Sequence, residues 1–253
     1  MKLMAYNILH GGQERLGFIM AAIKKESPDF LTINEANNFL DNDGKIIKEF
    51  SQEIGLPYYS ITSTAVGYTV VFLSKTAINK TTVLMPGKRE VLLTEVDSEF
   101  GPLSFASLHL SPTTEDVRLP EIQLIINSQK ATENRVIMGD MNSLSREDKY
   151  GPEIISNFNE TQLKKFTNNG QPRFEVIDAV LAANYQDTAV KLGKNKETTV
   201  PTPSNIDVAH ADLRLDDIFL SESLASHLVD YRVVKNELTA KASDHYPVVA
   251  VLE

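Results

Sequence analysis

Apolar positions in the first quarter of the chain follow two different periods. Residues 3–9 and 30–33 are nearly continuous apolar runs, which predict short buried strands. After each run, apolar residues recur at helical spacing over residues 16–23 and 46–54, and Ser27-Pro28 and Gly55 are typical of the ends of those helices. The pattern predicts two units in which a helix follows a strand and covers it.

Strand-like runs continue through the rest of the chain. We predict strands over residues 69–73, 91–96, 103–110, 136–138, 215–220 and 246–252, and a helix over about 120–130. Short turns join the middle strands, which indicates antiparallel pairing and therefore a mixed sheet. The sequence contains no interdomain linker or short repeat, so residues 1–253 are predicted to form one α/β domain.

Residues 143–199 depart from this pattern. They contain weak helical patterns near 153–158 and 161–166 and a polar run over 191–199, with little strand character. Such long connections often carry substrate specificity, and a solvated loop is the alternative. We predict that residues 198–203, together with those that follow Asn142, form the rim of a pocket.

Composition and charge narrow the chemistry. The chain has no cysteine, so a metal would be held by oxygen or imidazole, and oxygen ligands favour hard cations such as Mg²⁺ or Mn²⁺. The formal net charge of -9 disfavours a broad basic face for nucleic acid, although a local basic groove stays open. Because the sequence lacks an apolar run of membrane-spanning length and a signal-peptide core, we expect a cytoplasmic protein that does not bind a membrane.

Polar residues recur at the ends of the predicted strands. Asp244 and His245 stand just before the last apolar run, where a carboxylate and an imidazole could bind a metal and move a proton; a capped turn is the plain alternative. The other residues in comparable positions are Asn7, Glu35, His109, Asp140, Asn142 and Asp216. Because the ends of neighbouring strands meet beyond one edge of a sheet, we expect all of these residues to gather in one site.

In these motifs the chain resembles the endonuclease/exonuclease/phosphatase superfamily over essentially its full length. The segments that carry the resemblance are, in order, Tyr6-Asn7-Ile8 with Gly11-Gly12, Pro28-Asp29 leading to Asn34-Glu35, Leu108-His109-Leu110, Gly139-Asp140-Met141-Asn142, Arg214-Leu215-Asp216 and Ser243-Asp244-His245. The resemblance implies a deoxyribonuclease I-like fold, which is a four-layer sandwich of two mixed β-sheets flanked by helices. It also implies a divalent-metal-dependent hydrolase of phosphate esters.

The resemblance divides the site into a metal side and a phosphate side. On the metal side, Glu35 would be the principal ligand of Mg²⁺ or Mn²⁺. Asn7 and Asp244 would be further ligands, either directly or through water. The plain alternatives are an exposed loop acid for Glu35 and an Asx turn or a cap for Asn7.

On the phosphate side, the resemblance implies that Asp140 positions or deprotonates the attacking water and that Asn142 donates to a non-bridging oxygen. Two positions apart, these side chains would project to one side of an extended backbone. Asp216 would favour the protonated form of His245, which would act as a base or stabilise the transition state. His109 would be a donor or general acid, with a buried core histidine as the alternative. The residues leave open whether Asp140 or His245 takes the proton.

A few positions depart from the family pattern or lie outside its motifs. Asn34 stands where glutamine is frequent, and it should matter little if its side chain faces away. Asp217 stands where an aromatic residue is frequent, and we expect it on the opposite side of its strand, in an outer layer of the site or at the surface. His10 and His210 are possible rim residues, and His227 is expected to face solvent.

The leading hypothesis is a divalent-metal-dependent phosphoesterase that hydrolyses a phosphodiester or phosphomonoester by in-line attack of an activated water. A small-molecule substrate is preferred because the chain is acidic, with an endonuclease or exonuclease as the alternative, since charge distribution decides this point. The rival from another class is a non-catalytic binding module of the same fold. Such a module should have lost motif residues, and all of them are present. The sequence is silent on the oligomeric state.

Overall fold

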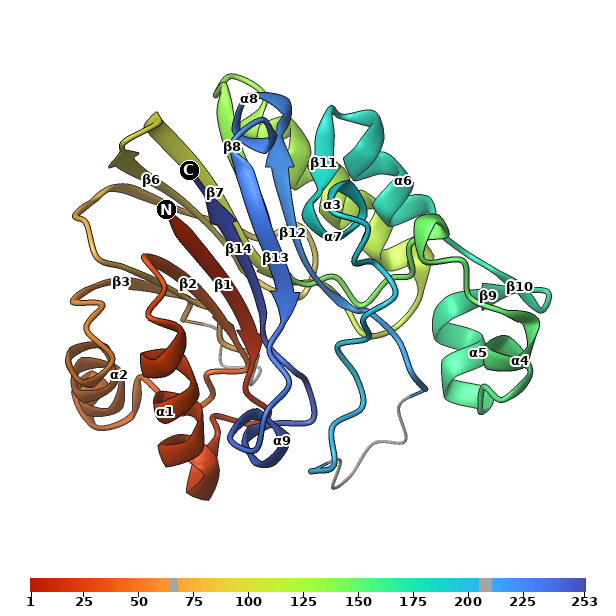
Figure 1. Ribbon diagram of the computed structural model, residues 1–253, viewed down its shortest axis with the longest axis horizontal. Helices are drawn as coiled ribbons and strands as arrows, with labels where there is room; N and C mark the ends of the chain where they lie inside the picture. The colour runs from red at the N-terminus through yellow and green to blue at the C-terminus, as the bar shows by residue number, and fades with distance from the viewer. Residues whose placement is uncertain (64–67, 205–210) are drawn as a thin grey trace.

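Two six-stranded sheets form the centre of the protein in a computed structural model that describes residues 1–63, 68–204 and 211–253 (Figure 1). The first sheet has the order β13 (Leu228–Val233), β14 (Val248–Leu252), β1 (Lys2–Asn7), β2 (Phe30–Asn34), β4 (Val71–Ser74) and β3 (Tyr58–Ile61). The second has the order β11 (Tyr185–Asp187), β12 (Asp216–Ser221), β8 (Asn134–Asp140), β7 (Gly101–His109), β6 (Val91–Ser98) and β5 (Ile78–Leu84). The pairs β1–β2 and β7–β8 are parallel and the other pairs are antiparallel, so both sheets are mixed.

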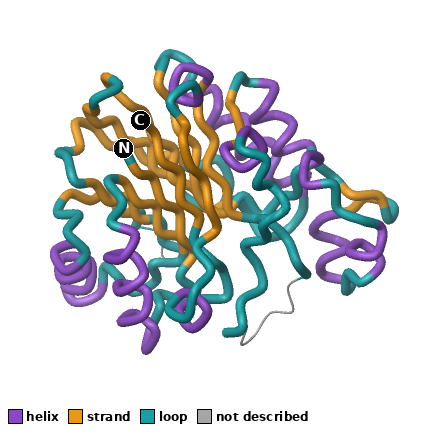
Figure 2. Tube along the Cα trace, in the orientation of Figure 1, coloured by secondary structure: helices purple, strands orange, loops and turns teal. Residues whose placement is uncertain are grey.

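Helices cover the outer faces of both sheets (Figure 2). Helices α1 (Leu16–Glu26) and α2 (Asp41–Glu53) pack on the first sheet, whereas α3 (Glu115–Gln129) and α6 (Glu175–Ala182) pack on the second. Along β1, Leu3 and Ala5 enter the core between the sheets, and Met4 and Tyr6 face the helices. Burial of both faces explains the continuous apolar run of this strand. The helix–sheet–sheet–helix layers confirm the predicted fold class.

The predicted strands and the three longest predicted helices are present, with shifted ends. Pro120, predicted near the start of its helix, lies inside α3, which begins at Glu115. Four strands of the two six-stranded sheets were not predicted, namely β3, β5, β11 and β13. β5 is an edge strand whose inner five residues are exposed, so it has no apolar run to detect.

Residues 143–199 are more regular than their sequence pattern predicts. They contain η2 (Arg146–Asp148), α4 (Pro152–Ser156), α5 (Glu160–Phe166), β9 (Thr167–Asn168), β10 (Gln171–Pro172), α6, β11 and α7 (Thr188–Lys191). Residues 152–172, hereafter the lobe, project away from the sheets at the right of Figure 1. Phe158 and Phe166 from the lobe pack with Leu144, Val200 and Leu215 in a separate small core. The remaining short helices are η1 (Gln13–Arg15), α8 (Glu222–Ala225) and α9 (Thr239–Ala242).

A buried ion cluster ties the chain before the lobe to the second sheet. The Arg214 guanidinium contacts Asp148 and Asp187 at 2.7 Å and also contacts Asp217. Asp217 therefore does point away from Asp216, but it is buried rather than at the surface. Attraction to the three carboxylates outweighs burial and raises the pKa of Arg214. No helix in the three described ranges has the length and apolar character needed to cross a membrane.

Candidate active site

Strand register brings the predicted site residues to one end of the two sheets. In the first sheet, Asn7 and Asn34 are paired terminal residues of β1 and β2, and Glu35 follows directly. In the second sheet, Asp140 ends β8 between His109 on β7 and Asp216 on β12, and it is in register with both. The segment that carries Asp244 and His245 leads into β14, the other neighbour of β1.

Asp140 is the centre of the site. Its Oδ2 atom accepts a hydrogen bond from Asn7 Nδ2 at 3.1 Å and lies 3.2 Å from His109 Nε2 and 4.0 Å from His245 Nε2. Burial would raise the pKa of Asp140, but His109, His245 and Lys165 outweigh that effect and hold it well below its usual range. Asp140 is therefore an ionised acceptor among hydrogen-bond donors.

Asp216 and His245 form a buried pair behind Asp140. His245 Nδ1 lies 2.7 Å from Asp216 Oδ2, which leaves Nε2 directed toward Asp140. Burial disfavours the imidazolium, but the charge and the hydrogen bond of Asp216 outweigh this effect and raise the pKa of His245 to about 10. At neutral pH His245 is thus a cation that donates from Nδ1 to Asp216 and directs its Nε2–H toward Asp140.

The predicted pocket rim, residues 198–203, is only partly a rim: Thr198 lines a cavity of about 330 Å³ with residues that follow Asn142, whereas three of its neighbours lie behind the Asp216–His245 pair. Thr199, Val200 and Thr202 are buried. The Thr199 hydroxyl oxygen accepts from the backbone N–H groups of Leu215 and Asp216 at 3.0 and 3.3 Å. The prediction was wrong for these three residues, because Thr199 satisfies backbone donors at the start of β12, Val200 packs in the small core, and the Thr202 hydroxyl donates to the Ser243 carbonyl.

The metal side is built around Glu35. Its Oε1 accepts from Asn7 Nδ2 at 3.2 Å, and its Oε2 accepts from the His10 backbone N–H at 3.1 Å. Glu35 and Asp140 thus direct carboxylate oxygens at the same neutral amide nitrogen. Negative charge that converges in this way, with oxygen donors alone, fits a hard divalent cation.

The other two predicted metal ligands have different surroundings. The Asn7 oxygen accepts from the Leu9 N–H at 3.1 Å, so the amide faces the carboxylates with its nitrogen. Asp244 is buried and accepts from Ser243 Oγ at 3.2 Å. The same Ser243 hydroxyl donates to the Asn7 carbonyl at 2.7 Å, which holds the Asp244 segment against the end of β1. Metal ligation by Asn7 and Asp244 stays a prediction.

The group with metal-binding geometry in the described part of the chain lies on the phosphate side instead. Ligand atoms of Asp140, Asp216 and His245 all lie within 4.8 Å of one another. However, Nδ1 of His245 already forms a hydrogen bond with Asp216 Oδ2, at 2.7 Å. We therefore describe these three as a proton-handling group, and metal ligation by Glu35 stays a prediction.

Asn142 lies beside Asp140, but not through an extended backbone. It adopts a left-handed conformation with φ 51, and its backbone N–H donates to Asp140 Oδ1 at 2.8 Å. Its amide nitrogen donates to the Leu110 carbonyl at 2.9 Å, and its oxygen accepts from Lys165 Nζ at 2.5 Å. The premise of an extended strand was wrong, since β8 ends at Asp140 and a tight turn follows.

Two cations of the site were not predicted. Lys165 reaches Asn142 from α5, and no motif in its helix distinguishes it from Lys164. Arg89 donates to the His109 and Leu110 carbonyls at 3.5 and 3.2 Å and stacks 3.8 Å above the Tyr68 ring. The sequence signal for Lys165 is indirect, because it lies in the segment expected to carry specificity, and Arg89 lies outside that segment.

The three histidines outside the motifs have separate outcomes. His10 is exposed next to Glu35, with Nδ1 3.6 Å from Glu35 Oε2, which places it at the mouth of the site. His227 is exposed, as predicted, and contacts the Glu253 carbonyl. His210 lies outside the described residues.

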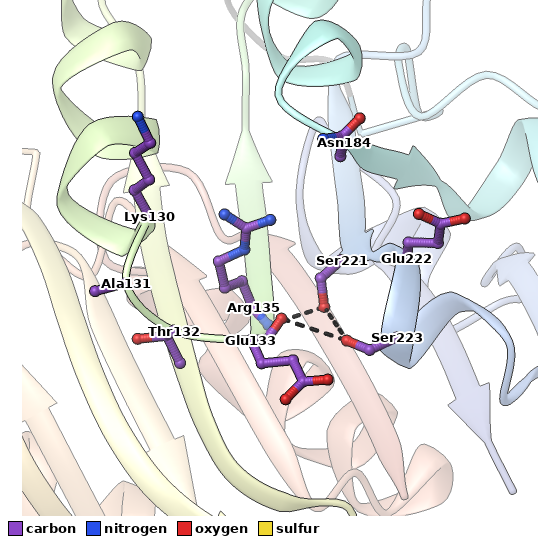
Figure 3. Close-up of a pocket in the computed structure, with 9 residues that line it drawn as sticks. All are labelled: Lys130, Ala131, Thr132, Glu133, Arg135, Asn184, Ser221, Glu222 and Ser223. Atoms are coloured by element: carbon purple, nitrogen blue, oxygen red, sulfur yellow. Dashed lines mark hydrogen bonds between the residues drawn. The ribbon is translucent and has the colours of Figure 1, made fainter.

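A cavity of about 470 Å³ lies at the opposite end of the second sheet (Figure 3). Arg135 near the start of β8 and Ser221 at the end of β12 line it, whereas the site residues Asp140 and Asp216 occupy the other ends of these strands. The two locations are separated by about 15 Å of strand. This cavity is therefore not part of the candidate active site.

Comparisons with known proteins agree with this geometry. The model of the Endonuclease/Exonuclease/phosphatase family matches residues 4–245. No curated protein matches the sequence. An AP endonuclease from Archaeoglobus fulgidus has 18% identity and a TM-score of 0.77, with 100% of this chain and 99% of that chain covered.

Two further solved structures share the fold. A 3′ phosphatase, NExo, from Neisseria bound to a product DNA hairpin has 19% identity and a TM-score of 0.74, with 100% of this chain and 99% of that chain covered. A truncated TDP2 from Caenorhabditis elegans has 15% identity and a TM-score of 0.63, with 98% and 95% covered. At these identities the likeness establishes the fold.

Proposed function

Because the chain belongs to the endonuclease/exonuclease/phosphatase family, we propose that it hydrolyses a phosphodiester or phosphomonoester by in-line attack of a water activated at Asp140. Family membership makes it a divalent-metal-dependent hydrolase acting on phosphate ester bonds. The observation that supports the site most strongly is the convergence of Asn7, His109 and His245 on the Asp140 carboxylate. A non-catalytic module would not need to retain every motif residue around this carboxylate.

Glu35 would hold the metal ion, with Asp244 as an additional ligand and Asn7 acting through a bound water, because the Asn7 amide turns its nitrogen toward the carboxylates. The donor set favours Mg²⁺ or Mn²⁺, because its side chains present oxygen rather than sulfur. When bound, such an ion neutralises charge on the phosphate and on the leaving oxygen. The Asn7 amide, which lies between Glu35 and Asp140, keeps these two carboxylates apart and sets the boundary between the two sides of the site.

Asp140, rather than His245, accepts the proton of the attacking water. His245 is protonated at neutral pH because of Asp216, so it has no free lone pair to act as a base. It instead donates from Nε2 to a phosphoryl oxygen as negative charge builds there. Asn142 donates to a second non-bridging oxygen, and His109, 3.2 Å from Asp140, protonates the leaving oxygen.

The substrate is a small phosphate ester. The acidic balance of the chain, with a net charge of -9, supports this choice, because contact with a nucleic-acid backbone relies on many basic side chains. A nuclease is the second candidate, since an AP endonuclease and a 3′ phosphatase bound to a DNA hairpin share the fold. A panel of both substrate classes separates the two.

The test is hydrolysis of p-nitrophenyl phosphate, bis(p-nitrophenyl) phosphate and an abasic DNA duplex, each with Mg²⁺ or Mn²⁺ and with a chelator. We expect metal-dependent turnover of at least one small ester that exceeds turnover of the duplex. Cleavage of the duplex alone would favour the nuclease. Absence of metal-dependent turnover across the whole panel would contradict the hydrolase.

A further inference from the structure

Lys165 is a cation in the candidate active site that the mechanism above does not use. It lies in the last turn of α5, within the lobe, and its Nζ donates to Asn142 Oδ1 at 2.5 Å. Asn142 in turn donates its backbone N–H to Asp140. The Lys165 ammonium group is thus linked to the proposed base, Asp140, through a single intervening residue, Asn142. It lies on the side of Asn142 that is proposed to contact the phosphate.

The fold holds Lys165 in place through a buried arginine. Arg118 of α3 is fully buried and donates to the Lys165 backbone carbonyl at 2.9 Å. Glu115 Oε2 accepts from Arg118 at 2.8 Å, and Arg118 Nε donates to Ser143 Oγ at 2.8 Å. Because Ser143 directly follows Asn142, the same cluster positions both partners of the Lys165 contact. Exposed lysines are not anchored in this way.

The charge of Lys165 is not cancelled by a paired acid. Its hydrogen-bond partner in the described part of the chain is a neutral amide, and it also lies 4.8 Å from the Phe166 ring. Burial lowers the pKa of Lys165 to about 8 despite attraction by Asp140, and repulsion from Arg118 and Arg89 adds to this effect. The ammonium therefore has two N–H donors left for an anion that enters beside Asn142.

We propose that Lys165 binds a terminal phosphate oxygen and makes the site selective for phosphomonoesters over phosphodiesters. A diester has two non-bridging oxygens and one negative charge, which Asn142 and His245 can satisfy together with the metal. A monoester presents a third terminal oxygen and a second charge. That oxygen needs its own cationic donor, and Lys165 is the neighbour of Asn142 that supplies one. The proposal rests on the proposed function of the same site.

The experiment compares Lys165→Met with Lys164→Met, which removes a charge from an exposed position on the same helix. We expect Lys165→Met to lower kcat/KM for p-nitrophenyl phosphate by about 10- to 100-fold and for bis(p-nitrophenyl) phosphate by less than about threefold. Lys164→Met should change neither. Lys165→Arg should recover part of the monoester activity, because it restores the charge.

A merely structural role gives a different result. If Lys165 only anchored the Asn142 amide, both esters would lose activity to the same extent, and this outcome overturns the proposal. Binding of inorganic phosphate to the Mn²⁺-loaded protein, measured by calorimetry, provides a readout that does not need turnover. If the wild-type protein hydrolyses neither ester, the proposed function is refuted. If Lys165→Met nevertheless binds phosphate more weakly than the wild type, the phosphate contact is supported. Unchanged phosphate affinity overturns the contact itself.

Discussion

Asn34 of one sheet accepts a hydrogen bond from the backbone N–H of Asp140 in the other, at 2.9 Å from Oδ1 to N. Its amide nitrogen donates to the Leu108 carbonyl at 2.8 Å, so one side chain satisfies two neighbouring strands of the second sheet. Gly139 permits this approach, because a Cβ there would lie 2.0 Å from the Leu108 oxygen. Asn34 was expected to matter little if its side chain faced away, and this condition is not met.

Removal of this bridge should affect both stability and turnover. Asn34→Ala leaves the Asp140 N–H and the Leu108 carbonyl unpaired, which should cost about 1–3 kcal/mol in urea unfolding and lower kcat. Thr32→Val is the matched control, since it breaks another bridge between the sheets, from Thr32 to Ser107 at 2.6 Å, away from Asp140. The control should lose stability but retain turnover. Equal turnover in the two variants would argue against a positioning role for Asn34.

Asp216 should control the protonation of His245. In Asp216→Asn the carboxylate charge is gone and burial dominates, so the pKa of His245 should fall from about 10 to below its ordinary value. Ring C–H resonances of the metal-free protein, titrated by NMR, report this directly, and His10→Gln and His227→Gln assign the signals of these two exposed histidines. In the wild type, a His245 midpoint near 6.5 would contradict the structure.

The same pair makes stability depend on pH in a defined direction. Since the folded-state pKa of His245 is raised, its stabilising contribution is complete below about pH 6.5 and is lost as pH rises toward about 10. Urea unfolding of the metal-free wild type should show this loss between pH 6.5 and 9.5, and Asp216→Asn should show less of it. A similar slope in both proteins would assign the effect to other groups.

Substitutions at Glu35 and at Asp140 should have different effects, the first on metal binding and the second on catalysis. Glu35→Gln should weaken Mn²⁺ affinity by about tenfold or more, as expected for loss of a direct ligand. Asp140→Asn should leave affinity within a few-fold but abolish turnover, because the proton acceptor is lost. Calorimetry with Mn²⁺ measures the first effect, with the exposed Glu53→Gln as a control. Equal weakening by both substitutions would place Asp140 among the metal ligands.

Arg214 should be a large contributor to stability. Arg214→Met leaves Asp148, Asp187 and Asp217 buried without their cation, which should cost about 3–5 kcal/mol at pH 7.5. The penalty should shrink at pH 5, because burial raises the pKa of Asp148 and Asp217 and the variant can protonate them. Arg232→Met, in a partly exposed ion pair, should cost less than about 1 kcal/mol. A loss below that value for Arg214→Met would show that the cluster is not stabilising.

The sequence pattern alone determined the main helices and strands of this protein and the residues at the ends of its strands, whereas the four-layer arrangement was implied by the family resemblance. Apolar runs that are buried on both faces, and amphipathic helices between them, are local patterns, so β1, α1, β2 and α3 could be recognised without coordinates. The motifs at Asn7, Glu35, Asp140 and His245 were visible for the same reason, because each follows or precedes such a run. Edge strand β5, exposed along its inner residues, carried no such signal.

Tertiary structure decided which residues support and extend the site. Asn34 and Asp140 are 106 positions apart, and Lys165 and Asn142 are 23 apart, so no periodicity relates them. Asp217 was placed on the correct side of its strand, yet its burial depended on Arg214 and on two acids from other segments. A local pattern specifies which face of an element is apolar. The partner of a polar side chain is set by sheet register and by the packing of distant segments, which only the assembled fold determines.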